Sequence, residues 1–306
     1  MILTQTIGDC RSERAKLGRL ALVPTMGALH EGHLRLVDLA REHAPHVAVS
    51  IFVNPTQFGP KEDFTKYPRP LEADLELCRQ RNVDLVFNPS VREMYPDRLP
   101  GAPALTFRSS DRSGAVAPES PAAEVVIDLP QLSEVLEGRF RPTHFRGVCQ
   151  VVAKLFNIVR PDVACFGQKD YQQLRILTAM VEDLNWPIEI VPCPIIRDPD
   201  GLAMSSRNRY LSPAERQRAL SINRALKAAE EEFKRGNRQA SRLVTTAQNI
   251  LLQGGEHGRV PLLIDYVAAV DAITLKSIQM IESPAVIAVA VRVGSTRLID
   301  NVLLNP

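Results

Sequence analysis

The sequence has few cysteines, and no two of them stand at a spacing used for zinc or redox chemistry. The 306-residue chain holds five cysteines. An odd, scattered set is typical of reduced thiols and not of a disulfide framework. We expect reduced thiols, in the core or on the surface, at Cys10, Cys78, Cys149, Cys165 and Cys193. The sequence also lacks a G-x-G-x-x-G fingerprint and a cluster of metal ligands.

Long apolar runs and an excess of one charge are absent as well. No segment approaches the ~18 apolar residues of a membrane span, and the N-terminus has no basic region followed by an apolar stretch and a cleavage site. The 37 basic and 35 acidic residues leave a net charge of +2, which gives no broad basic surface for nucleic acid. We therefore expect a cytoplasmic protein with neither a membrane nor a nucleic-acid partner.

Apolar runs alternate with helical patterns through the first two thirds of the chain. Continuous apolar runs predict strands buried on both faces, at 19–24, 47–53, 83–87 and 162–167. Amphipathic spacing predicts helices, at 34–42, 71–81, 148–159 and 171–184. This order predicts right-handed crossovers and a doubly wound parallel sheet of the α/β class.

The pattern changes twice along the chain. Residues 97–124 are rich in Pro, Ala, Ser and Gly, which predicts a mobile surface excursion. After a strand predicted at 188–196, charged helices at 213–236 and 240–252 precede apolar strands at 262–271 and 285–294. We predict two domains, residues 1–186 and a smaller α+β domain at 187–306.

Two histidines follow the first predicted strand, in P-T-M-G-A-L-H-E-G-H. Gly32 between them, and Gly27 before them, let the backbone approach a ligand closely. The N-terminus of the next helix offers unpaired N–H groups that favour phosphate. His30 and His33 are therefore placed to hold a triphosphate, and the alternative is a capped or partly buried core histidine.

Two later segments also carry phosphate-compatible donors. In C-F-G-Q-K-D, Lys169 can reach a phosphate, while Asp170 can cap the next helix or contact a ribose. In M-S-S-R, Ser205, Ser206 and Arg207 can close over phosphates. The alternative for M-S-S-R is an N-terminal cap of a short helix.

A fourth segment, F-V-N-P-T-Q-F-G, places uncharged amides after the second strand. Asn54 and Gln57 suit a small polar organic substrate, or they are ordinary turn residues. Since ligands bind at the carboxyl edge of a doubly wound sheet, we expect the four segments to meet there. None supplies a nucleophile with its base. The chemistry predicted is electrostatic: a nucleotide triphosphate held for attack by an outside nucleophile.

These motifs resemble those of the pantothenate synthetase (pantoate–β-alanine ligase) family, within the H-x-G-H nucleotidyltransferase superfamily. The resemblance rests on PTMGALHEGH, SIFVNPTQF, HFRGV, CFGQKDYQQL and MSSRNRYLS, and runs from about Leu20 to the C-terminus. It implies a Rossmann-like ATP- and pantoate-binding domain, a C-terminal lid domain and a homodimer. It also implies the ATP- and Mg²⁺-dependent joining of pantoate to β-alanine through a pantoyl adenylate.

The resemblance also implies the site residues. Those that bind ATP are Met26, Gly27, Ala28, Leu29, His30, Glu31, Gly32, His33, Gly167, Gln168, Lys169, Asp170, Ile196, Met204, Ser205, Ser206 and Arg207. The catalytic residues among them are His33, His30, Lys169, Ser205, Ser206 and Arg207. Gln57 and Gln173 bind pantoate, and Gln57 also contacts β-alanine. With Asn54, which its loop position already suggests for a small polar substrate, they make up the predicted substrate-binding set. The metal ligands stay unknown.

His33 is the proton donor by resemblance. A carboxylate nucleophile is already ionised near neutral pH, so we expect both histidines mainly to stabilise phosphate charge. Thr56 departs from the family, which often has methionine there.

The motifs leave three alternative functions. Another nucleotidyltransferase would need a basic pocket for a phosphorylated acceptor, where Asn54, Gln57 and Gln173 offer neutral groups. A tRNA synthetase is disfavoured by the near-neutral charge and by the lack of length for an anticodon domain. A non-catalytic nucleotide-binding regulator is disfavoured because His30, Lys169 and Arg207 are all present.

Overall fold

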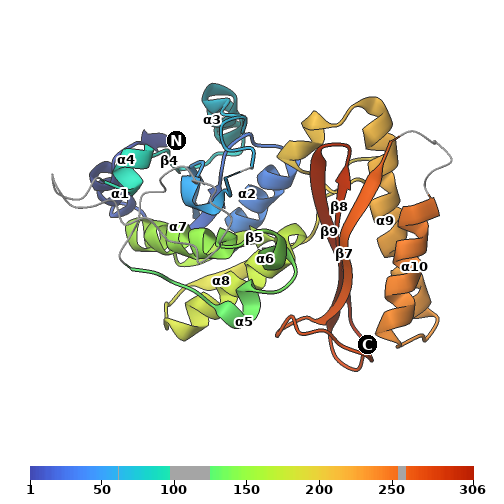
Figure 1. The fold of residues 1–306 in the computed structure, drawn as a ribbon. Helices are drawn as coiled ribbons and strands as arrows, with labels where there is room; N and C mark the ends of the chain where they lie inside the picture. Colours follow the sequence, from blue (N-terminus) through green and yellow to red (C-terminus); the bar gives the residue numbers. More distant parts are fainter. Residues whose placement is uncertain (61, 97–124, 254–259) are drawn as a thin grey trace. The chain divides into compact units, whose positions relative to one another are not determined.

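The computed structural model describes residues 1–60, 62–96, 125–253 and 260–306, and these form two compact units (Figure 1). The first unit comprises Met1–Ser133, Gly138–Phe166 and Ile176–Cys193, and the second comprises Glu134–Glu137, Gly167–Arg175 and Pro194–Pro306. The excursion predicted at 97–124 lies outside the described residues. The first unit runs past the boundary predicted at residue 187, because its last strand ends only at Cys193.

The first unit is built on a six-stranded sheet. Its strands are β1 (Ile2–Thr4), β2 (Leu20–Thr25), β3 (His46–Ile51), β4 (Leu85–Phe87), β5 (Val163–Gly167) and β6 (Glu189–Cys193), in the order β1-β4-β3-β2-β5-β6. The four pairs from β1 to β5 are parallel. Leu20 to Val23 are fully buried, as expected for a parallel strand covered on both faces. The predicted doubly wound α/β fold is confirmed.

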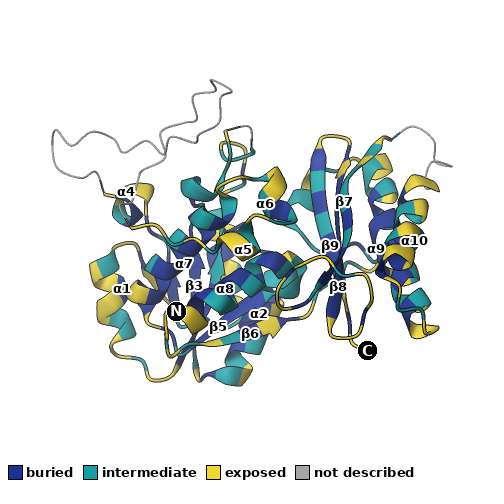
Figure 2. Cartoon of the chain, turned by 60° about the horizontal axis from the view of Figure 1, so that its bottom comes forward, coloured by how far each residue is buried: buried dark blue, intermediate teal, exposed yellow. Residues whose placement is uncertain are grey.

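Helices cover both faces of this sheet (Figures 1 and 2). On one face, α2 (Glu31–His43) and α3 (Leu71–Gln80) bury Leu36, Val37 and Leu75 against Val23 and Val49. On the other face lies α7 (His144–Val159), which contacts β2 and packs against α1 (Ile7–Arg14). The remaining helical segments that involve this unit are α4 (Val91–Met94), α5 (Pro130–Ser133), α6 (Glu137–Phe140), α8 (Tyr171–Asp183) and the 3₁₀ turn η1 (Pro55–Gln57).

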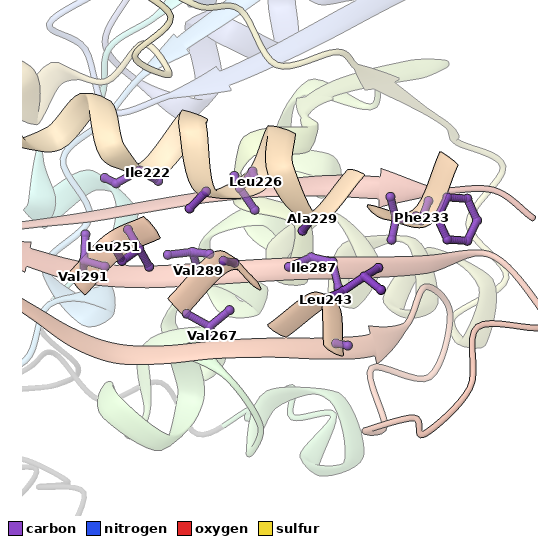
Figure 3. Packing of buried hydrophobic residues seen from close by; sticks show 14 of the residues in the cluster. Ile222, Leu226, Ala229, Phe233, Leu243, Leu251, Val267, Ile287, Val289 and Val291 are labelled. Carbon is purple, nitrogen blue, oxygen red and sulfur yellow. The ribbon is translucent and has the colours of Figure 1, made fainter. Parts of the chain in front are cut away.

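The second unit pairs a three-stranded antiparallel sheet with two helices. Its strands β7 (Leu262–Asp271), β8 (Ala285–Val293) and β9 (Thr296–Leu304) lie in that order, and α9 (Pro213–Lys234) and α10 (Ala240–Gln253) cover one face. Figure 3 shows Ile222 and Leu226 of α9 and Leu243 of α10 in one buried cluster with Ile287 and Val289 of β8. The predicted smaller α+β unit is thus confirmed, with β9 as an additional strand.

The short segments 134–137 and 167–175 belong to the second unit through buried polar contacts. Arg297 of β9 bonds the carboxylate of Glu137, and its Nε donates to Asp265 over 2.7 Å. The Tyr266 hydroxyl also donates to Glu137 (2.8 Å), and burial raises the pKa of Tyr266 above its usual range. The side chain of Gln172 accepts the N–H of Glu137 (2.9 Å). Packing on this sheet, and not chain order, therefore assigns these segments to the second unit.

No helix in the described part of the chain combines the length and apolarity that a membrane crossing requires.

Candidate functional site

The loop between β2 and α2 is held by a buried carboxylate from α3. Asp74 is 1% exposed, and it accepts the backbone N–H groups of Ala28 and Leu29 over 2.8 Å each. Gly27 has φ +80°, and a Cβ there would lie 2.9 Å from an Asp74 oxygen. Ala28 also has a left-handed φ of 52°. Asp74 could not be recognised from the sequence, because an acidic residue in the first turn of a helix is ordinary.

The two histidines of the H-x-G-H motif lie together at the N-terminus of α2. His30 is the N-cap, and its Nδ1 accepts the N–H of Gly32 over 3.2 Å. The ring centroids of His30 and His33 are 4.1 Å apart, with the rings tilted by 39°. A neutral imidazole whose Nδ1 accepts carries its proton on Nε2, so His30 is a cap and also has a donor at Nε2. The carboxylate of Glu31 is ion-paired with Arg81 (2.9 Å).

The predicted substrate amides lie at the two ends of η1, with Asn54 as its N-cap and Gln57 as its last residue, next to the loop between β2 and α2. The Gln57 Nε2 donates to the sulfur of Met26 (2.9 Å), and its Oε1 accepts from Asn54 (3.2 Å). Asn54 is 1% exposed. Its Nδ2 also donates to the carbonyl of Gly147 (3.1 Å), and its Oδ1 accepts the Tyr95 hydroxyl (2.9 Å). Gln57 is half-buried beside Met26, whereas Asn54 is enclosed by protein groups.

In the second unit, the loop that carries Lys169 (residues 167–170, called the lysine loop) rests on β9. Gly167 precedes the 3₁₀ turn η2 (Gln168–Asp170), which leads into α8. The side-chain amide of Asn301 donates to the carbonyl oxygens of both Gln168 and Lys169 over 2.9 Å. The Lys169 Nζ lies 3.8 Å from an Asp170 oxygen. Asn301 is buried and fixes the backbone from which Lys169 extends, and no local sequence pattern points to it.

Gln173 lies in the first turn of α8 and is half-buried. This turn is tied to the same unit, because the Tyr171 hydroxyl donates to the carbonyl of Ala272 (3.0 Å). Gln173 and Lys169 are thus carried by one short segment.

The M-S-S-R segment follows a tight hairpin in the second unit. The carbonyl of Ile196 accepts the N–H of Met204 (2.9 Å), and Gly201 turns the chain with φ +93°. The Ser205 hydroxyl then caps the 3₁₀ turn η3 (Ser206–Tyr210) by accepting the N–H of Arg207 (3.2 Å). The helix-cap alternative therefore describes Ser205 correctly, and the cap sets the backbone from which Ser206 and Arg207 extend.

Each unit gathers part of the predicted site. The first holds residues 26–33 with Asn54 and Gln57, and the second holds residues 167–173, Ile196 and 204–207. Across the described ranges, no group of three His, Cys, Asp or Glu side chains is arranged to hold a metal ion. Each unit thus contributes hydrogen-bond donors to the predicted set, and neither holds a built metal centre within the part of the chain that the structure describes.

Comparisons with known proteins agree with this description. Residues 3–303 match the model of the pantoate-beta-alanine ligase family. A pantothenate synthetase from Thermoanaerobacter sp. (strain X514) is 47% identical over 99% of this chain and 98% of its own. The crystal structure of pantothenate synthetase from Thermus thermophilus has a TM-score of 0.85 at 40% identity and covers both chains fully.

A third relative was solved with ligands. The pantoate-beta-alanine ligase from Francisella tularensis, complexed with beta-gamma ATP and beta-alanine, is 30% identical with a TM-score of 0.74, over 99% of this chain and 97% of its own. The family match spans nearly the whole chain, and several relatives exceed 30% identity over nearly all of it. This chain therefore belongs to the pantoate–β-alanine ligase family.

Proposed function

We propose that this chain makes pantothenate in two steps through a pantoyl adenylate. The overall activity, the ATP-dependent condensation of pantoate with β-alanine, is that of the family to which the chain belongs. The observation that carries the adenylate route is the pair of imidazoles at the N-terminus of α2, 4.1 Å apart. Such a donor set suits the oxygens of a triphosphate.

In the first step, a carboxylate oxygen of pantoate attacks the α-phosphorus of ATP. The bond from that phosphorus to the β-phosphate oxygen breaks, and pyrophosphate leaves. We assign His30, His33 and Lys169 to the stabilisation of the charge that develops on the phosphate oxygens. Ser205, Ser206 and Arg207 add hydroxyl and guanidinium donors. Since the nucleophile is already ionised, no group has to remove a proton from it.

We assign Gln57 and Gln173 to pantoate, whose hydroxyl groups and carboxylate suit neutral amide partners. Gln57 also borders β-alanine in this proposal. Asn54 differs from Gln57 in burial, because Asn54 is 1% exposed whereas Gln57 is only half-buried. We therefore assign Asn54 a positioning role and not a substrate contact.

In the second step, the amine of β-alanine attacks the acyl carbon of pantoyl adenylate. The carbon–nitrogen bond forms, the bond to the phosphate oxygen breaks, AMP leaves, and the amine loses a proton. Holding the amine and the acyl carbon close together in a reactive orientation accounts for much of the rate acceleration of this step.

Magnesium fits this site only as a partner of the nucleotide. Mg²⁺ is usually bound by one or two carboxylates together with substrate phosphates, and the described residues offer no cluster of three metal ligands. We propose that the ion is held chiefly by the phosphate oxygens, where it neutralises charge. The homodimer, the cytoplasmic location and the role of the second unit as a lid stay predictions.

Pantoate-dependent exchange of pyrophosphate into ATP tests this proposal, because it reports the first step alone. We expect exchange only when ATP and pantoate are both present, and AMP release once β-alanine is added. Equal exchange with unrelated carboxylates, or a strong preference for CTP, would contradict the proposal.

A further inference from the structure

The H-F-R-G-V motif begins α7, and the proposed function gives it no role. This motif lies in the first unit, where α7 packs against η1, the turn that carries Gln57. The contacts between these two elements are polar and specific.

The imidazole of His144 joins the two elements. Its Nδ1 lies 2.8 Å from the carbonyl oxygen of Gln57, and its Nε2 lies 3.0 Å from Nη1 of Arg141. A carbonyl oxygen only accepts hydrogen bonds, and a guanidinium only donates them. The imidazole is therefore neutral with its proton on Nδ1, and it donates to the carbonyl of Gln57.

Arg141 is fixed in turn by Glu62. Its Nε and Nη2 lie 2.7 and 2.6 Å from the two carboxylate oxygens. Such a two-point ion pair fixes the plane of the guanidinium, and so fixes the direction in which Nη1 meets His144. The Arg141 side chain is only 17% exposed, so water competes little for these bonds.

Gly147, one turn further along α7, allows the helix to approach η1 closely. A Cβ at this position would overlap the carbonyl group of Thr56. The carbonyl of Gly147 also accepts the side-chain N–H of Asn54 over 3.1 Å. Glycine is therefore required here by the backbone of η1 and not by the helix itself.

We propose that Glu62, Arg141, His144 and Gly147, together called the α7 brace, set the position of Gln57 for pantoate, and that His144 is a positioning residue acting through its Nδ1–H. This inference rests on the proposed contact between Gln57 and pantoate. The brace does not touch substrate, and it acts by holding the backbone from which the Gln57 amide extends.

Substitution of His144 by two different amide residues distinguishes the roles of its two ring nitrogens. In His144→Asn, the side-chain nitrogen can occupy the place of Nδ1 and still donate to Gln57. In His144→Gln, the longer amide can face Arg141 as Nε2 does, but it cannot also donate to Gln57. We expect His144→Gln to raise the dissociation constant for pantoate about tenfold and His144→Asn about twofold. Calorimetry measures both without turnover.

A second pair of variants tests whether the close approach of α7 to η1 affects pantoate binding. We expect Gly147→Ala to weaken pantoate binding about tenfold, although alanine favours a helix. The matched control is Gly8→Ala in α1, where a Cβ would meet only the Thr6 hydroxyl at 3.9 Å, and it should bind pantoate as the wild type does. Binding of α,β-methylene-ATP should change less than twofold in all four variants.

The outcomes of these experiments distinguish failure of the α7 brace from failure of the proposed function. Equal losses in His144→Asn and His144→Gln, wild-type affinity in His144→Gln, or equal losses for pantoate and the ATP analogue would overturn the α7 brace. If the wild-type chain shows neither pantoate binding nor pantoate-dependent exchange, the proposed function fails, and the inference fails with it. If the wild type binds pantoate and the variants do not differ from it, only the inference fails.

Discussion

The carboxylate of Asp74 accepts the backbone N–H of Ala28 over 2.8 Å, across 46 positions of the chain. Its other oxygen accepts the N–H of Leu29 over the same distance. A residue with no substrate contact in the proposal thus fixes the loop that leads to His30. This loop includes an alanine at φ 52°, a conformation that costs energy without such support.

Asp74→Asn tests this support. An amide keeps the size of the side chain but offers only one accepting oxygen, and its NH₂ group then faces a backbone N–H. We expect the free energy of unfolding to fall by about 1–3 kcal/mol, and KM for ATP to rise more than KM for pantoate. Urea unfolding and exchange kinetics measure the two effects. An unchanged KM for ATP would show that the loop holds its shape without this carboxylate.

His30 combines a helix cap with the proposed phosphate contact, and two substitutions separate these roles. Asparagine is a good N-cap, so His30→Asn keeps the cap and removes the Nε2 donor. We expect His30→Asn and His30→Ala both to lower the exchange rate by roughly 10²–10³. Only His30→Ala should also lose about 1 kcal/mol of stability. Wild-type exchange in His30→Asn would remove the imidazole from the mechanism.

Substitutions of Asn301 test whether β9 positions the lysine loop. Its amide donates to two carbonyl oxygens, so a carboxylate of the same size would repel both. We therefore expect KM for ATP to increase from wild type to Asn301→Ala and again to Asn301→Asp, with KM for pantoate less affected. Steady-state kinetics of the wild type and the two variants measure these KM values. If Asn301→Asp resembles the wild type, the residue only fills space.

The ion pair between Glu62 and Arg141 predicts a pH-dependent stability. Burial by itself would raise the pKa of Glu62, but the Arg141 guanidinium outweighs it and holds the pKa below its usual range. The ionised carboxylate therefore stabilises the fold above its unfolded pKa of about 4.3, and this stabilisation is lost as the pH falls through the lower folded pKa.

Glu62→Gln should accordingly lower the free energy of unfolding by about 2 kcal/mol at pH 7. The difference from wild type should shrink below about pH 4. Glu76→Gln is the control, because Glu76 and its partner Arg79 are both more than half exposed, and it should change stability by less than roughly 1 kcal/mol. A constant difference between Glu62→Gln and wild type from pH 7 to pH 3 would contradict this account.

The five cysteines are all buried and reduced, so they should resist alkylation. Burial raises the pKa of Cys10 and Cys78 to about 11 and the pKa of Cys149 and Cys165 to about 12. At pH 8, about one thiol in a thousand or fewer is then ionised and reactive. We expect iodoacetamide to leave the native protein unmodified and to label all five sites in urea, as mass spectrometry measures. Rapid labelling of the native protein would contradict this.

The sequence alone predicted the elements whose signals are local. The apolar run before Pro24 and the glycine-containing turn after it placed His30 at the start of a helix. Likewise, Ser212 and Glu215 form a capping box with Pro213 as the first helical residue, so α9 begins at the residue predicted. Such patterns depend on neighbours within one or two turns, so they can be recognised along the chain.

Tertiary structure alone decided which distant residues support the site. His144 meets the carbonyl of Gln57 across 87 positions, and Asn301 meets that of Lys169 across 132. It also placed residues 167–175 with the antiparallel sheet, although they follow a strand of the parallel one. Side-chain spacing encodes which face of a helix or strand is buried. A hydrogen bond from a side chain to a distant backbone carbonyl exists only after sheets and helices have packed, and no local pattern specifies it.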